Sequence, residues 1–212
     1  MIILLIILAS FAVGAYFYPR MPETVASHWN IDGDVDGYMS KFWGLFLMPI
    51  ISLAMFFFFI LIPKMDPLKA NIEKFRNYFD NFIVAILLFF LYVHLLTVAW
   101  NLGARFNMIQ FMSPAFGLLF YCSGVLIENA KRNWFIGIRT PWTFSSEEVW
   151  QKTHKVGGGL FKIAGVIAFG GLILPNLALF LVLFPALFFS IYVVAYSYLE
   201  YRKITPAKNN GN

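Results

Sequence analysis

FWGLFLMPIISLAMFFFFILI, residues 42–62, contains no charged side chain. About 20 apolar residues at about 1.5 Å of rise per residue are enough to cross the hydrocarbon core of a bilayer as an α-helix. Other apolar runs of similar length lie on both sides of it, at residues 1–18, 78–101, 108–127, 156–174 and 176–198. The sequence therefore predicts an all-α, polytopic integral membrane protein, with six transmembrane helices in a single transmembrane domain over residues 1–212.

The composition excludes the main alternatives to a membrane protein. Hydrophobic residues make up 60% of the chain and charged residues 13%, whereas soluble domains average about 45–50% and about 25%. Intrinsic disorder requires low hydrophobicity and high charge, which is the opposite pattern. Cys122 is the single cysteine, so an internal disulfide framework is impossible. We expect a multi-pass protein of the cell membrane.

The first apolar run has a second interpretation, as a secretory signal peptide. No basic residue precedes it, and Gly14-Ala15 provides only a poor small-residue cleavage site. We expect a retained helix. Cleavage would leave five helices and the same orientation for the rest of the chain.

Lys and Arg alternate strongly between the two sides of the membrane. The loops on one side carry three basic residues, Arg20, Lys41 and Arg105. The loops and tail on the other side carry twelve: Lys64, Lys69, Lys74, Arg76, Lys131, Arg132, Arg139, Lys152, Lys155, Arg202, Lys203 and Lys208. The positive-inside rule then places both termini in the cytoplasm. Segment 19–41 becomes an outer loop and segment 129–155 an inner loop.

The net charge of +5 follows from this topology. Anionic lipid at the cytoplasmic surface is a sufficient partner for the basic residues. Direct binding to nucleic acid is not expected, because the loops are too short to form a clustered basic face.

Few ionisable residues lie inside the predicted spans, and no acid occupies a span centre. This pattern disfavours an ion-coupled transporter. Lys162 either extends toward the cytoplasmic interface or pairs with Glu128, and His94 is a packing residue or, alternatively, a proton relay. Small residues on one face of the fifth span predict close helix packing: Gly157, Ala164, Ala168 and Gly171.

The outer loop is rich in turn-forming residues and acids. Asp32, Asp34 and Asp36, followed by Gly37, match the first half of a calcium-binding loop. The twelfth position of such a loop should be an acid, but it is Trp43 here, so calcium is the weaker alternative to solvated Asp-Gly turns. A lone His28 cannot form a zinc site, and we expect neither a metal nor another cofactor.

The inner loop contains a helix start and a constrained arginine. Thr143 or Ser145 before Glu147-Glu148 predicts an N-cap and a short interfacial helix over 146–155, with Val149 and Trp150 facing inward. Gly137 and Pro141 stiffen the chain around Arg139. Its guanidinium could bind a carboxylate or phosphate, anchor at lipid headgroups or form an internal salt bridge.

Together the two loops resemble the SdpI family, bacterial immunity proteins named for the Sdp toxin system. The front of that family is a domain of unknown function with an M-P…H-W-N…G…D-G-Y…K pattern. Its matching residues here are Met21, Pro22, His28, Trp29, Asn30, Gly33, Asp36, Gly37, Tyr38 and Lys41. The second family pattern is matched by Asn133, Gly137, Ile138, Arg139, Thr140, Pro141, Trp142, Thr143, Val149, Trp150, Thr153, His154, Gly157 and Gly158.

The resemblance implies a membrane immunity protein that is also a signal receptor. Such proteins protect the cell from a secreted, membrane-active peptide toxin and hold a small cytoplasmic repressor at the membrane when toxin is present. By this reading His28, Trp29, Asn30, Gly33, Asp36, Gly37 and Tyr38 serve the extracellular toxin side. The cytoplasmic partner side is served by Asn133, Gly137, Arg139, Thr140, Pro141, Trp142, Trp150, Thr153 and His154.

Two other functions remain alternatives. An integral-membrane enzyme could act on a lipid or amphipathic substrate at the cytoplasmic interface, with His154 close to Glu147, Glu148 and Arg139. A small transporter is the other, weakened by the missing acid at mid-membrane. We expect the protein not to be an enzyme.

Overall fold

The computed structural model describes residues 1–205. Its elements are α1 (Ile2–Phe17), β1 (Thr24–Trp29), β2 (Val35–Ser40), α2 (Lys41–Met65), α3 (Lys69–Glu73), α4 (Arg76–Asn101), α5 (Met108–Asn129), α6 (Pro141–Ser145), α7 (Glu147–Ile173) and α8 (Ala178–Ile204). Short 3-10 turns, Tyr18–Arg20 and Pro175–Leu177, follow α1 and precede α8. Lys208, which contributed to the predicted orientation, lies outside the described residues.

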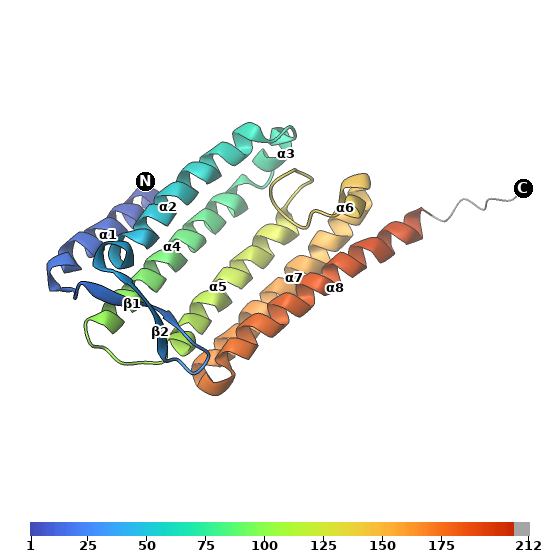
Figure 1. Cartoon of the computed structure of the whole chain (residues 1–212). Helices are drawn as coiled ribbons and strands as arrows, with labels where there is room; N and C mark the ends of the chain where they lie inside the picture. Colours follow the sequence, from blue (N-terminus) through green and yellow to red (C-terminus); the bar gives the residue numbers. More distant parts are fainter. Residues whose placement is uncertain (206–212) are drawn as a thin grey trace, which may run out of the picture.

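Within the described residues, six helices are long and apolar enough to cross a membrane, as the sequence predicted. They confirm a multi-pass membrane protein. The chain enters α1 and leaves α8 at the end of the bundle that carries α3 and α6, and the hairpin lies at the opposite end (Figure 1). Which end faces the cytoplasm stays a prediction, and "inner" (α3 and α6) and "outer" (hairpin) keep that sense below.

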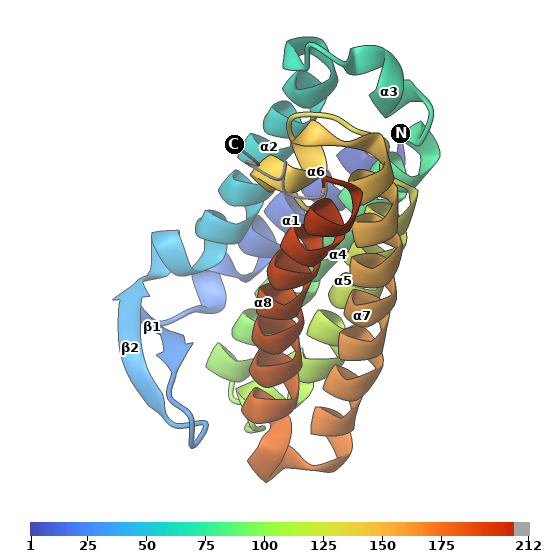
Figure 2. The same ribbon diagram turned by 90° about the vertical axis from the view of Figure 1, so that its right-hand side faces the viewer.

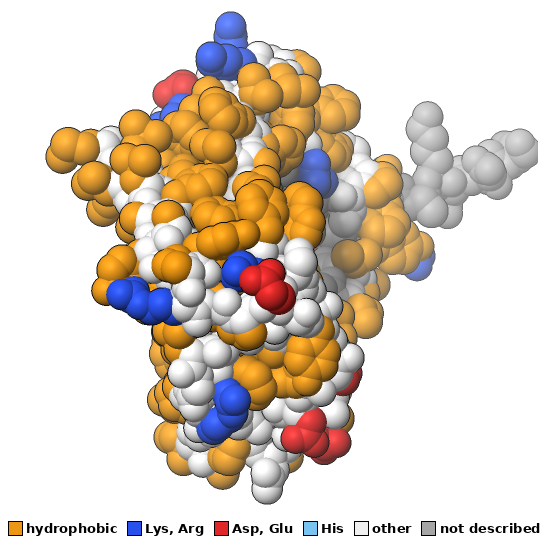
Figure 3. Space-filling model, turned by 60° about the vertical axis from the view of Figure 1, so that its left-hand side comes forward, with side chains coloured by type: hydrophobic (Ala, Val, Ile, Leu, Met, Phe, Trp, Pro, Cys, Tyr) orange, Lys and Arg blue, Asp and Glu red, His pale blue; other side chains and the backbone are white. Residues whose placement is uncertain are grey.

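The helices form two groups of three that meet at α4 and α5. In the first group α1, α2 and α4 pack on one another, and in the second α7 packs between α5 and α8. Figure 2 shows α8 beside α7, with the hairpin extending along the outer part of the bundle. On the face shown in Figure 3, hydrophobic side chains cover much of the surface and the charged ones lie in small groups. This exposed apolar surface suits contact with lipid.

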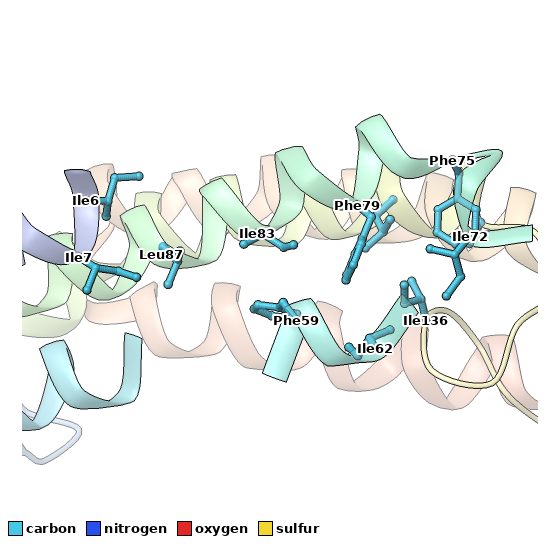
Figure 4. Packing of buried hydrophobic residues seen from close by; sticks show 12 residues of the cluster. Ile6, Ile7, Phe59, Ile62, Ile72, Phe75, Phe79, Ile83, Leu87 and Ile136 are labelled. Atoms are coloured by element: carbon cyan, nitrogen blue, oxygen red, sulfur yellow. The ribbon is translucent and has the colours of Figure 1, made fainter. Parts of the chain in front are cut away.

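An apolar cluster holds the first group together and reaches the inner loop (Figure 4). Ile6 and Ile7 of α1 lie near Leu87 of α4, at the middle of the bundle. Toward the inner end, Phe59 of α2 meets Phe79 of α4 edge to face, with ring centroids 5.9 Å apart. Ile136 of the inner loop belongs to the same cluster, so its burial ties that loop to the first helix group.

Glycines let α5 and α7 approach backbone to backbone. A Cβ on Gly165 would lie 2.5 Å from the Gly117 carbonyl oxygen, and a Cβ on Gly124 would lie 2.5 Å from that of Gly158. Close packing of the fifth span is therefore confirmed, but the contact face differs in part from the predicted one. Gly171 does face Ser113 of α5, whereas Gly157 faces Ile138 and Val193 instead.

One feature of the outer loop was not predicted, and one prediction for the inner loop was wrong. The outer loop contains a β-hairpin, because Thr24–Trp29 and Val35–Ser40 pair in antiparallel register with an irregularity at His28, and the expected Asp32-Gly33 turn lies between the strands. Residues 146–155 do not form a separate short helix, because α7 begins at Glu147 and continues without a break through the fifth span. Val149 and Trp150 are nevertheless buried, as expected.

Candidate functional site

The hairpin is fixed to the end of α4 by one asparagine. The Asn101 side-chain amide donates to the Ala26 carbonyl at 3.0 Å, and its oxygen accepts from the Ala26 N–H at 2.8 Å. It thus pairs with β1 as a neighbouring strand would. Trp29 packs edge-on against Trp100 of α4, with centroids 5.5 Å apart, and secures the far end of β1.

The predicted toxin-side residues divide between the turn and the surface of this hairpin. Asn30 shapes the turn, since its side-chain oxygen accepts from the N–H groups of Asp32 and Asp34, and Gly33 adopts a positive φ of 87° there. His28 pairs with Asp36 across the strands through Nδ1, next to Gly37, whose added Cβ would crowd His28. Tyr38 is exposed.

The acids of the outer loop do not assemble a metal site. Asp36 is paired with His28, and the Asp32 and Asp34 backbones close the turn on Asn30. No group of three potential metal-ligating side chains occurs within residues 1–205. The structure therefore gives no support to the calcium alternative.

Asn101→Ala is expected to release the hairpin from the bundle while the helices stay folded. The substitution removes both hydrogen bonds to the backbone of Ala26. Because Ala26 is buried, its unpaired N–H and carbonyl should cost about 1–3 kcal/mol of local stability. Limited trypsin digestion of the purified protein in detergent would then cleave faster at Arg20 and Lys41. Asn176→Ala, an exposed asparagine at the same end, is the control. Equal cleavage rates in both variants would contradict this role.

At the inner end, a buried asparagine organises the start of the family's second motif. The Asn133 oxygen accepts from the N–H groups of Phe135 and Ile136, and its amide donates to the carbonyls of Lys131 and Ile136. Its hydrogen-bonding capacity is fully used inside the loop. Asn133 therefore shapes the loop and presents no free group to a partner.

His154 holds the next part of the loop on α7. The Ile138 N–H donates to His154 Nε2 at 3.0 Å, and Nδ1–H donates to the Trp150 carbonyl at 2.8 Å. Both partners fit one neutral tautomer. The imidazole also stacks on Trp150, with centroids 3.9 Å apart. Gly137 lies against Nε2 with a φ of 109°, so a side chain there would meet both strain and a clash.

A hydroxyl network joins the loop to α8. Thr140 caps α6 through a reciprocal contact with Thr143, and its hydroxyl lies 3.1 Å from that of Ser197. Thr153 is also buried, and its hydroxyl has no hydrogen-bond partner among the described residues. The predicted N-cap of the following helix was wrong, because Ser146, rather than Thr143 or Ser145, accepts from the Val149 N–H and caps α7.

Three of the predicted partner-side residues reach the surface. Arg139 is exposed and donates through Nη1 to the Trp134 carbonyl at 2.6 Å, and Pro141 beside it is exposed as well. Trp142 is half-buried against Tyr198 of α8, with centroids 5.0 Å apart. Trp134 is 54% exposed and adds an aromatic ring to this face. We call Trp134, Arg139, Pro141 and Trp142 the inner surface patch.

The proposed enzymatic cluster does not form around His154. Glu147 is near Arg132 at 3.6 Å, and Glu148 pairs with Lys152 at 2.8 Å. Both nitrogens of His154 are engaged in the loop contacts described above. The candidate base thus has no free lone pair to accept a proton from a substrate.

The two ionisable residues inside the spans behave differently. Lys162 pairs with Glu128 at 2.7 Å, which links α7 to α5 and decides between the two roles predicted for it. His94 is buried in α4, and neither ring nitrogen has a partner within the described chain.

Sequence reasoning missed several residues that hold the site. Asp66, buried after α2, accepts from the Leu68 and Trp134 N–H groups and thereby joins two inner loops. Asn71 donates to the Arg132 carbonyl, which adds a second link between them. Glu200 of α8 is 4% exposed and pairs with Lys152 of α7 at 3.3 Å. Asp66 comes directly after the second span and two residues before Leu68, which was a possible sign of a turn. Nothing in the sequence indicated that it would also bind the Trp134 N–H.

Comparisons with known proteins agree with the motif resemblance. Residues 5–53 match the model of a domain of unknown function (DUF1648), and residues 129–197 match that of the SdpI/YfhL protein family. The chain is 25% identical to the "Immunity protein SdpI" of Bacillus subtilis (strain 168) over 166 residues. This aligned region covers 77% of the present chain and 76% of the relative. No solved structure matches. The predicted resemblance is thereby confirmed: the chain is similar to the SdpI/YfhL protein family over residues 129–197 and to the DUF1648 domain over residues 5–53.

Proposed function

We propose that this protein protects its cell from a secreted, membrane-active peptide toxin and reports the toxin's presence to a cytoplasmic repressor. The name of the Bacillus subtilis relative supports the immunity part. Similarity to that family makes an enzymatic role less favoured, and the engaged nitrogens of His154 argue in the same direction.

The observation that carries the proposal is the position of the two motifs that resemble the family, one at each end of the same helix bundle. At the outer end the hairpin exposes His28, Asp36 and Tyr38. At the inner end a buried framework supports the inner surface patch. Two separate contact surfaces, one on each side of a membrane, are what a protein needs if it meets one ligand outside and another inside.

Charge and chemistry suit the inner surface patch to a protein partner. Arginine and tryptophan are enriched in protein interfaces because they combine large contact area with directional polar groups. Arg139 uses one N–H on Trp134, so most of its five donors stay available for a partner carboxylate.

Arg139→Ala is expected to abolish repressor recruitment while leaving the fold intact, because the side chain is exposed and its described hydrogen bond goes to a loop carbonyl. His28→Ala is expected to reduce toxin protection without loss of folded protein, since exposed ion pairs contribute only about 0–1 kcal/mol. Protection would be measured with a membrane-potential dye in sensitive bacteria challenged with the Sdp toxin. Recruitment would be measured as membrane localisation of a fluorescently tagged candidate repressor.

Empty vector and Lys131→Ala, an exposed basic residue outside the inner surface patch, are the controls. Wild-type protein that preserves no membrane potential would contradict the immunity proposal. Unchanged protection by His28→Ala would remove the hairpin from it, and unchanged recruitment by Arg139→Ala would remove the inner surface patch.

A further inference from the structure

A cavity of about 550 Å³ lies under the hairpin, where the two helix groups meet. Strand β1 and the turn after it close one side through Trp29 and Ile31, and Thr97 of α4 lies on another. The remaining wall is apolar and comes mainly from α5 and α8, with Met112 and Val182 among its residues. The volume falls within the range of about 300–1,000 Å³ that is typical of ligand sites.

Two acids follow the cavity-lining Ile31 in the hairpin turn, and we call this stretch the rim. Asp32 and Asp34 are exposed there, and neither forms an ion pair with any residue that the structure describes. The basic residues of the outer end are engaged elsewhere: Lys41 pairs with Glu23, Arg20 lies over the Tyr16 ring and Arg105 lies over the Trp100 ring. The rim therefore attracts cations.

Ile31 strengthens the case for an amphipathic ligand. It lines the cavity and is 70% exposed at the tip of the hairpin, directly before the acids. An apolar wall, an exposed apolar side chain and two free carboxylates next to each other complement a segment that carries hydrophobic and basic residues together.

We propose that this cavity binds a hydrophobic, cationic segment of the peptide toxin, with apolar side chains inside and a Lys or Arg at Asp32 and Asp34. This inference rests on the proposed immunity function and names the site and the chemistry through which the toxin is captured. The hairpin serves as the wall that the ligand contacts first.

Binding of fluorescently labelled Sdp toxin to the full chain in zwitterionic-lipid nanodiscs tests this site. Met112→Trp fills the cavity and should weaken binding at least about 10-fold, since a bulky ring displaces the ligand from a wall that cannot move freely. Leu118→Trp is the matched control, because Leu118 is on the same helix, 51% exposed and outside this cavity. It should leave affinity unchanged.

One further variant does not depend on cavity packing. Asp32→Asn combined with Asp34→Asn should weaken binding and flatten its dependence on salt, because screening acts on the charge contact alone. Melting temperatures of all variants identify any that fail to fold. If Met112→Trp fails to fold, the binding affinity of the variant with both exposed acids replaced decides the result.

The outcomes separate this inference from the immunity proposal. If the wild-type protein protects cells, and the folded cavity and acid variants bind toxin as tightly as the wild type does, the cavity site is overturned. The immunity proposal is then unaffected. Protection without measurable toxin binding does the same. If a phospholipid copurifies with the wild type, is not displaced by toxin and is absent from Met112→Trp, then lipid is the occupant of the cavity. That result overturns the inference. Wild-type protein that neither binds nor protects overturns both.

Discussion

Gly165→Leu should prevent the bundle from packing, and Gly165→Ala should already destabilise it by about 1–3 kcal/mol. The reason is that α5 and α7 touch through their backbones here. A Cβ at Gly165 would lie 2.5 Å from the Gly117 carbonyl and 2.8 Å from the Tyr121 nitrogen, neither of which can rotate away as a side chain would. Helices in a membrane depend on such close approach, since lipid removes most of the hydrophobic drive for their association.

Gly159 supplies a matched control on the same helix. A Cβ there meets nothing within 4 Å, so Gly159→Ala should be neutral or stabilise α7 by up to about 1 kcal/mol through helix propensity. Thermal unfolding of the purified proteins in detergent, followed by tryptophan fluorescence and size-exclusion chromatography, provides the measurement. A Gly165→Leu protein that melts at the wild-type temperature as a single species would show that α5 and α7 do not meet in this way.

The spans were predictable because hydrophobic length alone determines which segments can cross a bilayer. The partners of the spans were not. Small residues in the fifth span signalled close packing, but the sequence does not indicate that Gly158 and Gly165 face α5 while Gly157 faces Ile138. The hairpin was missed because its strands are short and its alternation is weak. Its stability comes from Asn101, about sixty residues after β2, through contacts that no local pattern encodes.

The sequence predicted which residues belong to the candidate site. It did not predict which of them are buried supports and which are exposed. The motif around Arg139 reads in sequence as one continuous recognition segment. In the structure Asn133, Thr140 and His154 are buried supports, whereas neighbours such as Arg139 and Pro141 are exposed. Asp66 and Ser197 belong to the same support, although Asp66 follows α2, Ser197 is in α8 and neither is part of a motif. Tertiary hydrogen bonds of this kind leave no periodic signal.

His154→Ala and Gly137→Ala should have the same consequence, namely an unfastened inner loop and lost partner recruitment. His154→Ala removes a buried ring stacked on Trp150, together with the acceptor for the Ile138 N–H, and should cost about 3 kcal/mol or more. Gly137→Ala leaves the histidine in place, yet it drives a methyl group into Nε2 and forces a strained φ on alanine. Both changes separate the loop from α7.

The comparison distinguishes a supporting histidine from a catalytic one. Trypsin cleavage at Lys131 and Arg132, and recruitment of the tagged repressor, should change together in the two variants, whereas Arg139→Ala should lose recruitment with normal cleavage. If His154 were instead a general base, His154→Gln would abolish activity without loosening the loop. Gly137→Ala would then retain more function than His154→Ala. That order of effects would contradict the structural role, because the clash at Gly137 acts on function only by displacing the loop that His154 holds.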